Sequence, residues 1–483
     1  MKKTLLLALL ATGAAFAQPH VTANGREVAV EQLARFDVPV RYARCTAGDG
    51  RGLRVELALG APVPGFRISS LRHDVSARVA GNRLVLDVPE PQDLVLHLDG
   101  QEDFFLFVDG PARWDLGQRP RLEIASFGVD PTGARVDTAL IQRAIDETAR
   151  VGGVLHVPTG VYRSGQLNLR SHLTLLLDEG ALLCGSLNPA DYPGKALLRG
   201  QGVEDVRLLG RGTVDGSGWA GLRKAGATDV HLVFLSDCRN IEVDGLVLRD
   251  PTFWNTRVFR SENVHLRHVK VVNNRPRENW TNTDGVDFDS SSDCSLEDAF
   301  VHAGDDNLVV KGLDDSGRHS TRHIRFERVL TVSNSAVAKI GTETCVPEFR
   351  DVVFRDVDAV RCKRAMVIDA LDHTAVHGVR FENFHIESFA LEGSESPRLI
   401  DFEITNKTWR PCDGNCTIED VSLRNVQIDV DPAVAPSRIL GRNQQFGIRG
   451  VTVTGLTALG RAVATPAALH LQLNDFVSGL ELR

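Results

Sequence analysis

The feature that most constrains the fold is a short repeat in the second half of the chain. Each unit has a polar turn residue, an apolar-x-apolar triplet, a polar pair and a second such triplet, as in Ile241–Asp250 and Val379–Ser388. Alternation with a period of two predicts a pair of short strands in each unit. The third position of the unit is apolar in eight copies: Leu208, Val243, Leu266, Leu296, Phe326, Phe354, Phe381 and Leu423.

Units of this length cannot bury an apolar face alone, so they must stack on one another. Successive copies lie 23 to 42 residues apart, which predicts corner loops of different lengths. We therefore predict an all-β chain whose main domain is a parallel β-helix. The alternatives are a β-sandwich or a propeller, but propeller blades run to about 40–45 residues and need hairpins. The Asp-Gly pair at 244–245 lies inside a unit and not between units, where a hairpin would need it.

Two segments before the repeat have patterns of their own. Residues 18–118 alternate apolar and polar residues between Pro and Gly, which predicts a small β-sandwich ending in a linker near 110–120. Apolar spacing predicts a helix over 138–151, with Asp137 or Thr138 as its cap. This helix would cover the open end of the β-helix domain, residues 119–483.

The first residues predict export. Residues 1–17 have a basic start, an apolar core and a small-residue cleavage site, as a secretory signal peptide does. Its removal would change the formal charge from −8 to −10 by loss of Lys2 and Lys3. We therefore expect a secreted or periplasmic bacterial protein. Of the eight cysteines, Cys412 and Cys416 close a short Gly-containing loop and are the one predicted disulfide.

Charge and hydropathy exclude two kinds of partner. The chain is acidic and has no Lys/Arg tract, so it lacks the basic field that holds nucleic acid. Beyond the N-terminus no run of 18 apolar residues occurs, so we expect no membrane span. We expect a monomer.

Three motifs in the repeat region resemble a known family. They are PTFW at 251–254, NTDGVD at 282–287 and GDDNLVVK at 304–311, after a segment from Phe127 that resembles the start of pectin-degrading β-helix enzymes. The chain resembles glycoside hydrolase family 28, the polygalacturonases. The resemblance implies a right-handed, single-stranded parallel β-helix that hydrolyses glycosidic bonds with inversion.

Three carboxylates are the candidate catalytic groups. Asp284 and Asp305 are 21 residues apart, about one turn of the solenoid, so Asp284, Asp305 and Asp306 should lie in one patch. Crowded carboxylates raise the pKa of one member, which leaves a proton donor beside ionised neighbours. By matching motif positions, Asp305 would be the general acid, and Asp284 and Asp306 would hold and activate water. Asp287 and Asp289 are expected to be turn or surface residues.

The chain departs from the family pattern at two places. The family has His where this chain has Ala336, and an Arg-Ile-Lys triplet where this chain has Val367 and Asp369. Without those cations the site should bind a uronate carboxylate poorly. Candidate replacement contacts to the substrate are Lys311, Lys339 and Glu343, together with Asn282 of the first motif.

Four functions are consistent with these patterns to different degrees. The favoured one is an exported hydrolase of a pectin-type polysaccharide in the plant cell wall. The alternatives are a hydrolase of a neutral α-linked glycan, resembling dextranases, and a non-catalytic glycan-binding β-helix. A pectate lyase would need a calcium-binding acidic cluster, and the motifs fit hydrolysis better. No His/Cys metal-ligand spacing, phosphate-binding loop or serine nucleophile elbow occurs, so we expect no metal or cofactor.

Overall fold

The structure is a computed structural model that describes residues 19–33, 40–48, 52–69, 74–273, 282–392, 396–405 and 413–483. Contacts between residues divide the chain into two compact units, and the boundary along the chain lies at Pro111/Ala112. The predicted signal peptide and Cys412 lie outside the described residues. Cys416 is buried.

The N-terminal unit is a β-sandwich, as predicted. Its two sheets share one hydrophobic core, to which Val55 and Leu86 contribute from one sheet and Leu94 and Leu106 from the other. The first sheet has the order β2 (Arg26–Val28), β1 (His20–Ala23), β5 (Leu53–Ala58), β8 (Arg83–Val88) and β7 (Ser76–Ala80). The second has the order β3 (Val30–Leu33), β4 (Val40–Thr46), β10 (Phe104–Asp109), β9 (Gln92–Leu98) and β6 (Phe66–Ser69).

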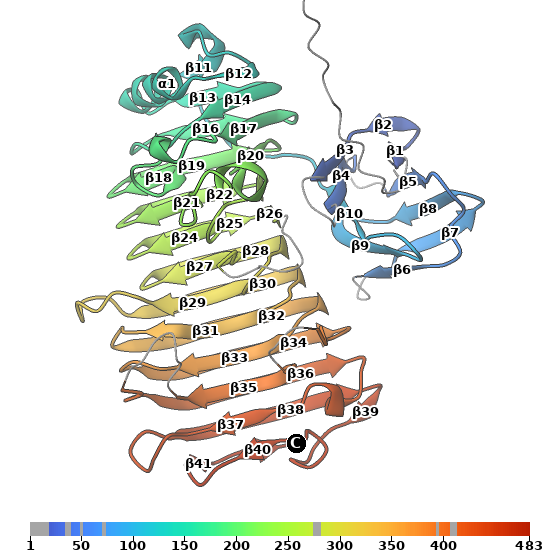
Figure 1. Cartoon of the computed structure of the whole chain (residues 1–483), viewed down its shortest axis with the longest axis vertical. Coiled ribbons are helices and arrows are strands. Elements are labelled where there is room, and N and C mark those ends of the chain that lie inside the picture. The colour runs from blue at the N-terminus through green and yellow to red at the C-terminus, as the bar shows by residue number, and fades with distance from the viewer. Residues whose placement is uncertain are drawn as a thin grey trace, which may run out of the picture. The chain divides into compact units, whose positions relative to one another are not determined.

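The second unit is a parallel β-helix, whose strands stack along one axis in Figure 1. We call its smaller sheet the site sheet, because it carries the candidate residues. The site sheet runs in the order β15 (Leu167–Asn168), β18 (Ala196–Gln201), β21 (His231–Ser236), β24 (Thr256–Phe259), β27 (Val286–Asp289), β29 (Leu308–Gly312), β31 (Ala336–Thr344), β33 (Arg364–Ala370), β35 (Arg398–Ile404), β37 (Arg438–Leu440) and β40 (Gln472–Leu473).

The other sheet, here called the long sheet, receives two short strands from each early turn and one long strand from each later turn (Figure 1). Its early part has β11 (Arg121–Glu123), β12 (Thr132–Val136), β13 (Val154–Val157), β14 (Gly160–Ser164), β16 (Thr174–Leu177), β17 (Ala181–Gly185), β19 (Glu204–Gly210), β20 (Thr213–Asp215), β22 (Arg239–Asp244), β23 (Val247–Arg249), β25 (Glu262–Arg267) and β26 (Lys270–Val272). Its later part has β28 (Ser292–His302), β30 (Thr321–Val332), β32 (Glu348–Arg361), β34 (Ala375–Ile386), β36 (Thr417–Ile428), β38 (Ile448–Ala458), β39 (Arg461–Ala462), β41 (Val477–Ser478) and β42 (Glu481–Leu482).

The predicted register of the repeat is confirmed. Each of the eight third-position residues is the direct strand partner of the next, from the Leu208–Val243 pair to the Phe381–Leu423 pair. The side chains form an inner column in which Phe326, Phe354 and Phe381 stack with ring centroids 5.1 and 5.2 Å apart. Stacked rings bury apolar area and interact favourably with each other, so this column holds neighbouring turns in register.

The polar turn residues explain how the chain rounds each corner. Asp205, Asn240 and Asn263 adopt left-handed backbone conformations with φ of +56°, +56° and +57°. Asn and Asp tolerate this region better than other non-glycine residues. Their side chains also form a ladder, in which Asn263 donates to Asn240 over 2.8 Å and Asn240 donates to Asp205 over 3.0 Å.

The predicted capping helix is present as α1 (Thr138–Arg150), and Asp137 precedes it. Its buried residues Ile141, Ala144 and Ile145 belong to the hydrophobic core of the β-helix, so the helix covers the end of that core. The Asp137 side chain does not cap α1 but accepts a hydrogen bond from the backbone N–H of Asp130 at 2.7 Å. Short helical turns occur at η1 (Ile124–Phe127), η2 (Pro189–Asp191), η3 (Gly218–Leu222) and η4 (Pro432–Val434).

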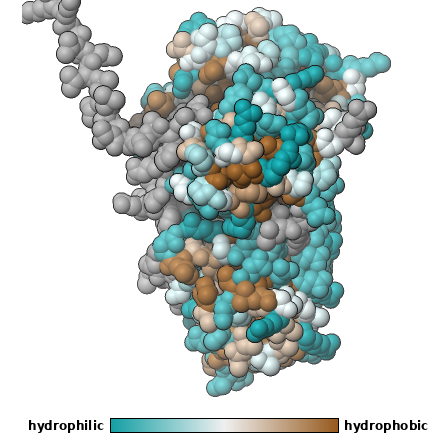
Figure 2. Space-filling view, turned by 90° about the vertical axis from the view of Figure 1, so that its right-hand side faces the viewer, coloured by the Kyte–Doolittle hydropathy of each residue, from teal (hydrophilic) through white to brown (hydrophobic). Residues whose placement is uncertain are grey.

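Hydrophobic side chains are mostly enclosed. On the face shown in Figure 2, hydrophilic residues cover much of the surface and hydrophobic ones form separate patches. The large exposed hydrophobic residues of the described chain come from different elements: Val136, Val151, Leu187, Leu391, Val434, Leu459 and Leu473. Within the described residues, no helix is both long and apolar enough to cross a membrane.

Candidate active site

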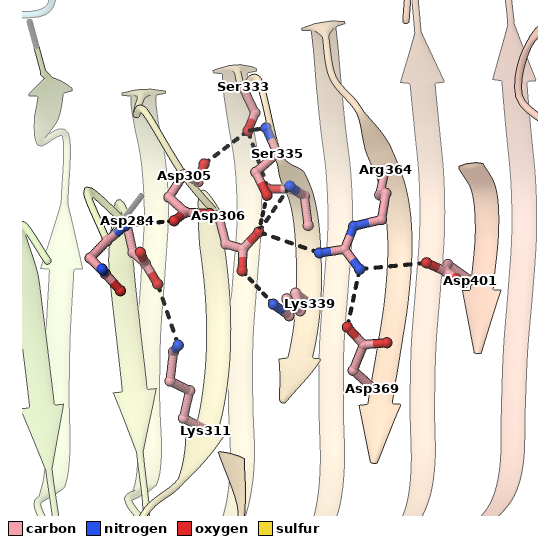
Figure 3. A network of polar contacts seen from close by, with 12 residues as sticks. Asp284, Asp305, Asp306, Lys311, Ser333, Ser335, Lys339, Arg364, Asp369 and Asp401 are labelled. Carbon is pink, nitrogen blue, oxygen red and sulfur yellow. Dashed lines mark hydrogen bonds and ion pairs between the residues drawn. The ribbon is translucent and has the colours of Figure 1, made fainter. Parts of the chain in front are cut away.

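The candidate residues lie where successive turns enter the site sheet (Figure 3). Asp284 precedes β27, and Asp305 and Asp306 precede β29, the next strand of the same sheet. Because β27 and β29 pair directly, with Val286 opposite Leu308, the motifs lie on adjacent turns as their spacing predicts. The structure thus brings all three carboxylates to one edge of the site sheet.

Asp306 is held as a carboxylate. One oxygen accepts from Lys339 Nζ at 2.6 Å, and the other accepts from the Ser335 hydroxyl at 2.6 Å and from the Ala336 N–H at 3.0 Å. The Arg364 guanidinium lies 3.9 Å away. Burial alone would raise the pKa of Asp306, but Lys339 and Arg364 outweigh it and hold this pKa far below its usual range.

Asp305, the next residue, has the opposite tendency. Its carboxylate accepts a hydrogen bond from the Asn282 backbone N–H at 2.6 Å, and the side chain is half-buried. Burial, followed by the negative charge of Asp306, raises the pKa of Asp305. Two adjacent carboxyl groups therefore differ in their affinity for a proton, and Asp305 is the one that retains it more strongly.

Asp284 shares its surroundings with Asp287. Asp284 is 3% exposed, and its nearest cation is Lys311 Nζ at 3.4 Å. Burial, and next the Asp287 carboxylate, raises the pKa of Asp284 well above its usual range. Burial likewise raises the pKa of Asp287 to about 8. Two close carboxyl groups that are both buried cannot both ionise cheaply near neutral pH, so the pair holds a proton.

The expectation that Asp287 and Asp289 are turn or surface residues is wrong, because both are completely buried in β27. Asp287 lies 3.8 Å from Lys311 Nζ, and Asp289 accepts from Arg257 at 2.6 Å. They point away from the hydrophobic core, but side chains of the neighbouring turns cover them. Alternation along one strand identifies the outer face and does not show how far that face is buried.

The other predicted site residues also gather here. Lys311 Nζ lies 3.1 Å from Glu343 and 4.2 Å from the centre of the Trp254 ring. Burial would lower the pKa of Lys311, but Glu343, Asp284 and Asp287 together raise it well above its usual value. Lys311 is thus a buried cation surrounded by carboxylates of the chain itself.

The sequence analysis missed one cation. Arg364 begins β33 and reaches Asp369 at 3.1 Å and Asp401 at 3.5 Å. The family pattern has its cations at positions 367 and 369. Arg364 alternates with the core residues Met366 and Ile368, so the strand pattern alone would place it on the inner face. The available signal was a charged residue at the first position of a strand whose only other charged residue is Asp369.

One group of described residues has metal-ligating side chains close together, and it lies outside this patch. His172, Glu204 and Asp205 are all exposed and have ligand atoms within 4.8 Å of one another. Exposed acidic groups of this kind need no ion, so this group is not evidence for a cofactor.

The fold and the site together define a class of protein, the parallel β-helix proteins that gather carboxylates on one sheet. The same fold is found in the structure described as "Structure of Yersinia enterocolitica Family 28 Exopolygalacturonase". The TM-score is 0.57 at 15% sequence identity, and the match covers 94% of this chain and 98% of the other. Residues 148–460 match Glycosyl hydrolases family 28, and the chain belongs to this family.

Curated relatives have related names. A "Probable polygalacturonase" of Vitis vinifera is 27% identical over 278 residues, which is 51% of this chain and 56% of the relative. An "Exo-poly-alpha-D-galacturonosidase" of Dickeya chrysanthemi is 25% identical over 414 residues, which is 71% of this chain and 63% of the relative. The chain thus spans less than two thirds of the length of these two relatives.

Proposed function

We propose that this protein is an exported, inverting glycoside hydrolase that cleaves a pectin-type polysaccharide. Membership of family 28 and the names of the relatives support the reaction and the substrate class. The observation that carries the proposal is the contrast between neighbouring carboxyl groups: Asp306 is held ionised, while the pKa of Asp305 is raised. Inverting hydrolysis needs one proton donor and one ionised carboxylate on opposite sides of the bond that breaks.

The proposed reaction assigns a role to each carboxylate. Asp305 donates its proton to the glycosidic oxygen, so that the leaving sugar departs as an alcohol. A water molecule held by Asp284 and Asp306 attacks the anomeric carbon from the opposite face and gives up a proton to Asp306, the ionised carboxylate. The configuration at the anomeric carbon inverts. Lys339, Ser335 and the Ala336 N–H fix the orientation of Asp306 for this role.

A hydrolase of a neutral glycan is the second candidate, and one observation favours it. Asp369 stands where the family pattern has a cation, and its carboxylate lies against Arg364. A purely glycan-binding protein is less well supported, because crowding carboxyl groups costs stability without a benefit to binding.

The remaining properties rest on sequence and surface. Export rests on the signal-peptide pattern of residues 1–17. A monomeric state is supported by the scattered distribution of the exposed hydrophobic residues. The formal charge of −8 argues against nucleic acid as a partner.

The test is hydrolysis by the purified chain. Reducing-sugar release from esterified pectin, polygalacturonate and rhamnogalacturonan would be measured beside the Asp305→Asn variant, and proton NMR would identify the first anomer released. We expect release from at least one pectic polymer, with inversion, and its loss in the variant. Equal release by the variant, or retention of configuration, would contradict the proposal.

A further inference from the structure

We propose that the sugar bound beside Asp305 and Asp306 carries no charge: it is a neutral sugar, or a uronic acid whose carboxylate is esterified. This inference rests on the proposed function and narrows its substrate. It follows from the ion pairs that the cations of the site form with carboxylates of the chain itself.

Among the described residues, the cations beside the three aspartates are Lys311, Lys339 and Arg364, and each already has a carboxylate partner. Lys339 Nζ lies 2.6 Å from Asp306, and Lys311 Nζ lies 3.1 Å from Glu343. Both lysines are about 5% exposed. A substrate carboxylate would have to displace an internal partner, and that partner would then be buried without a counter-charge.

Arg364 is paired with two carboxylates of its own region. Its guanidinium lies 3.1 Å from Asp369 and 3.5 Å from Asp401, and Figure 3 shows it between these two carboxylates and Asp306. Asp369 and Asp401 are 1% and 0% exposed. Asp401 also pairs with Arg438, so one cation does not satisfy the acidic groups of this region.

The register of the strands shows which side chains lie beside Lys339 in the site sheet. Val309, Lys339, Val367 and Asp401 are direct partners across β29, β31, β33 and β35. Both valines alternate with residues of the inner hydrophobic core, so they belong to the outer face. The positions flanking the lysine are therefore apolar, and the next one is an acid.

Electrostatics then decides against a free uronate. Lys311 is paired with three carboxyl groups, and the separate network that links Lys339, Arg364 and Arg438 contains four, so carboxyl groups outnumber cations in both. A carboxylate brought into this network meets like charges and no uncommitted partner within it. Like-charge juxtaposition across a binding surface is strongly unfavourable. An uncharged sugar avoids that repulsion.

The test compares substrates that differ in charge. Initial rates of the full chain would be measured on polygalacturonate, on the same polymer with most carboxylates methyl-esterified, on a rhamnogalacturonan backbone and on dextran. Among the substrates that can place an uncharged sugar beside Asp305 and Asp306, we expect the best to have a kcat/KM at least about tenfold higher than that of polygalacturonate. The esterified polymer, the rhamnogalacturonan and dextran separate the esterified-uronate from the neutral-sugar form.

A variant tests the cause. Asp369→Asn removes one negative charge and should raise kcat/KM for polygalacturonate relative to the best uncharged substrate by about fivefold or more. Asp298→Asn is the matched control, because it removes a carboxylate from an arginine pair on the long sheet, and it should leave that ratio unchanged.

The possible failures are distinguishable. A wild-type rate on polygalacturonate that equals or exceeds the others would overturn this inference, whatever the variant does, and would still support a pectin hydrolase. Hydrolysis of none of the polymers would overturn the proposed function itself.

Discussion

The outer face of the site sheet uses arginine in two different ways. In its N-terminal half, Arg257 lies over aromatic rings, with its guanidinium carbon 5.1 Å from the centre of Phe234 and 4.7 Å from that of Phe259. The guanidinium carbon of Arg199 also lies over Phe234, 4.7 Å from the centre of the ring. In the C-terminal half, Arg364 instead lies between Asp369 and Asp401.

The contrast shows that one backbone supports two kinds of binding surface. Both halves have the same strand pairing and the same inner core. Arg257 has Asp289 as its carboxylate partner and also lies on aromatic rings, whereas three carboxylates enclose Arg364. In the proposed function, the first half would bind along a polymer, and the reacting carboxyl groups lie between the halves, where β27 and β29 begin. The following predictions test this division.

The largest effect is expected from the catalytic acid. Asp305→Asn removes the proton donor while retaining the shape of the side chain, so kcat should fall by about 10²–10⁴-fold. Arg199→Gln, in the aromatic half, should change kcat far less than KM. Steady-state kinetics on one polymer would measure both, with circular dichroism as the control for folding. A comparable loss of kcat in both variants would abolish the distinction between the halves.

The next effect concerns stability. Arg364→Ala leaves Asp369 and Asp401 buried with less counter-charge, which should lower the free energy of unfolding by about 3–5 kcal/mol. Arg257→Ala should cost less, because its partner Asp289 also accepts from the Leu313 N–H at 2.8 Å and from the Ser290 hydroxyl at 2.8 Å. Denaturant unfolding at neutral pH measures the difference. The reverse order would show that the aromatic half depends more on its arginine.

The dependence of stability on pH should come from β27, beside the catalytic carboxyl groups. Asp287 has a pKa of about 8 in the folded chain, above its unfolded value near 3.8. Between these values the folded state binds more protons than the unfolded state, so stability from this group falls as pH rises. Asp287→Asn should reduce the decline in unfolding free energy between pH 5 and 8 by about 1–2 kcal/mol. An unchanged slope would show that Asp287 is not the group responsible.

A smaller effect is expected from the ring that two arginines share. Phe234→Leu retains apolar volume but removes the π-surface under Arg199 and Arg257. The loss should be about 1 kcal/mol in stability and a few-fold increase in KM for a long polymer. Phe259→Leu provides a comparison, since Arg257 and Arg260 lie over that ring. Thermal unfolding and kinetics together would detect the change.

The inner and outer faces differ in how far the sequence predicts them. The inner column, from Leu208 to Leu423, follows from apolar spacing alone, because inward residues obey a simple rule of burial. Asp287 and Arg364 do not follow such a rule. Both residues make their contacts with strands one or more turns away. Their roles therefore depend on how the strands of the site sheet align, and the repeat pattern is weaker in those strands. The family motifs located Asp284, Asp305 and Asp306, and the strand pairing added the rest.

The stacking of turns has a consequence for how a substrate is measured. Neighbouring parallel strands lie about 4.8 Å apart, a spacing comparable to the length of one sugar unit in an extended chain. Each turn of the solenoid therefore advances along the axis by about the length of one sugar unit. Arg199 is in β18, three strands along the site sheet from Asp287 in β27. In the proposed function, a polymer laid along this axis would contact Arg199 several sugars from the cleaved bond, and insertion of one turn would increase that distance by about one sugar.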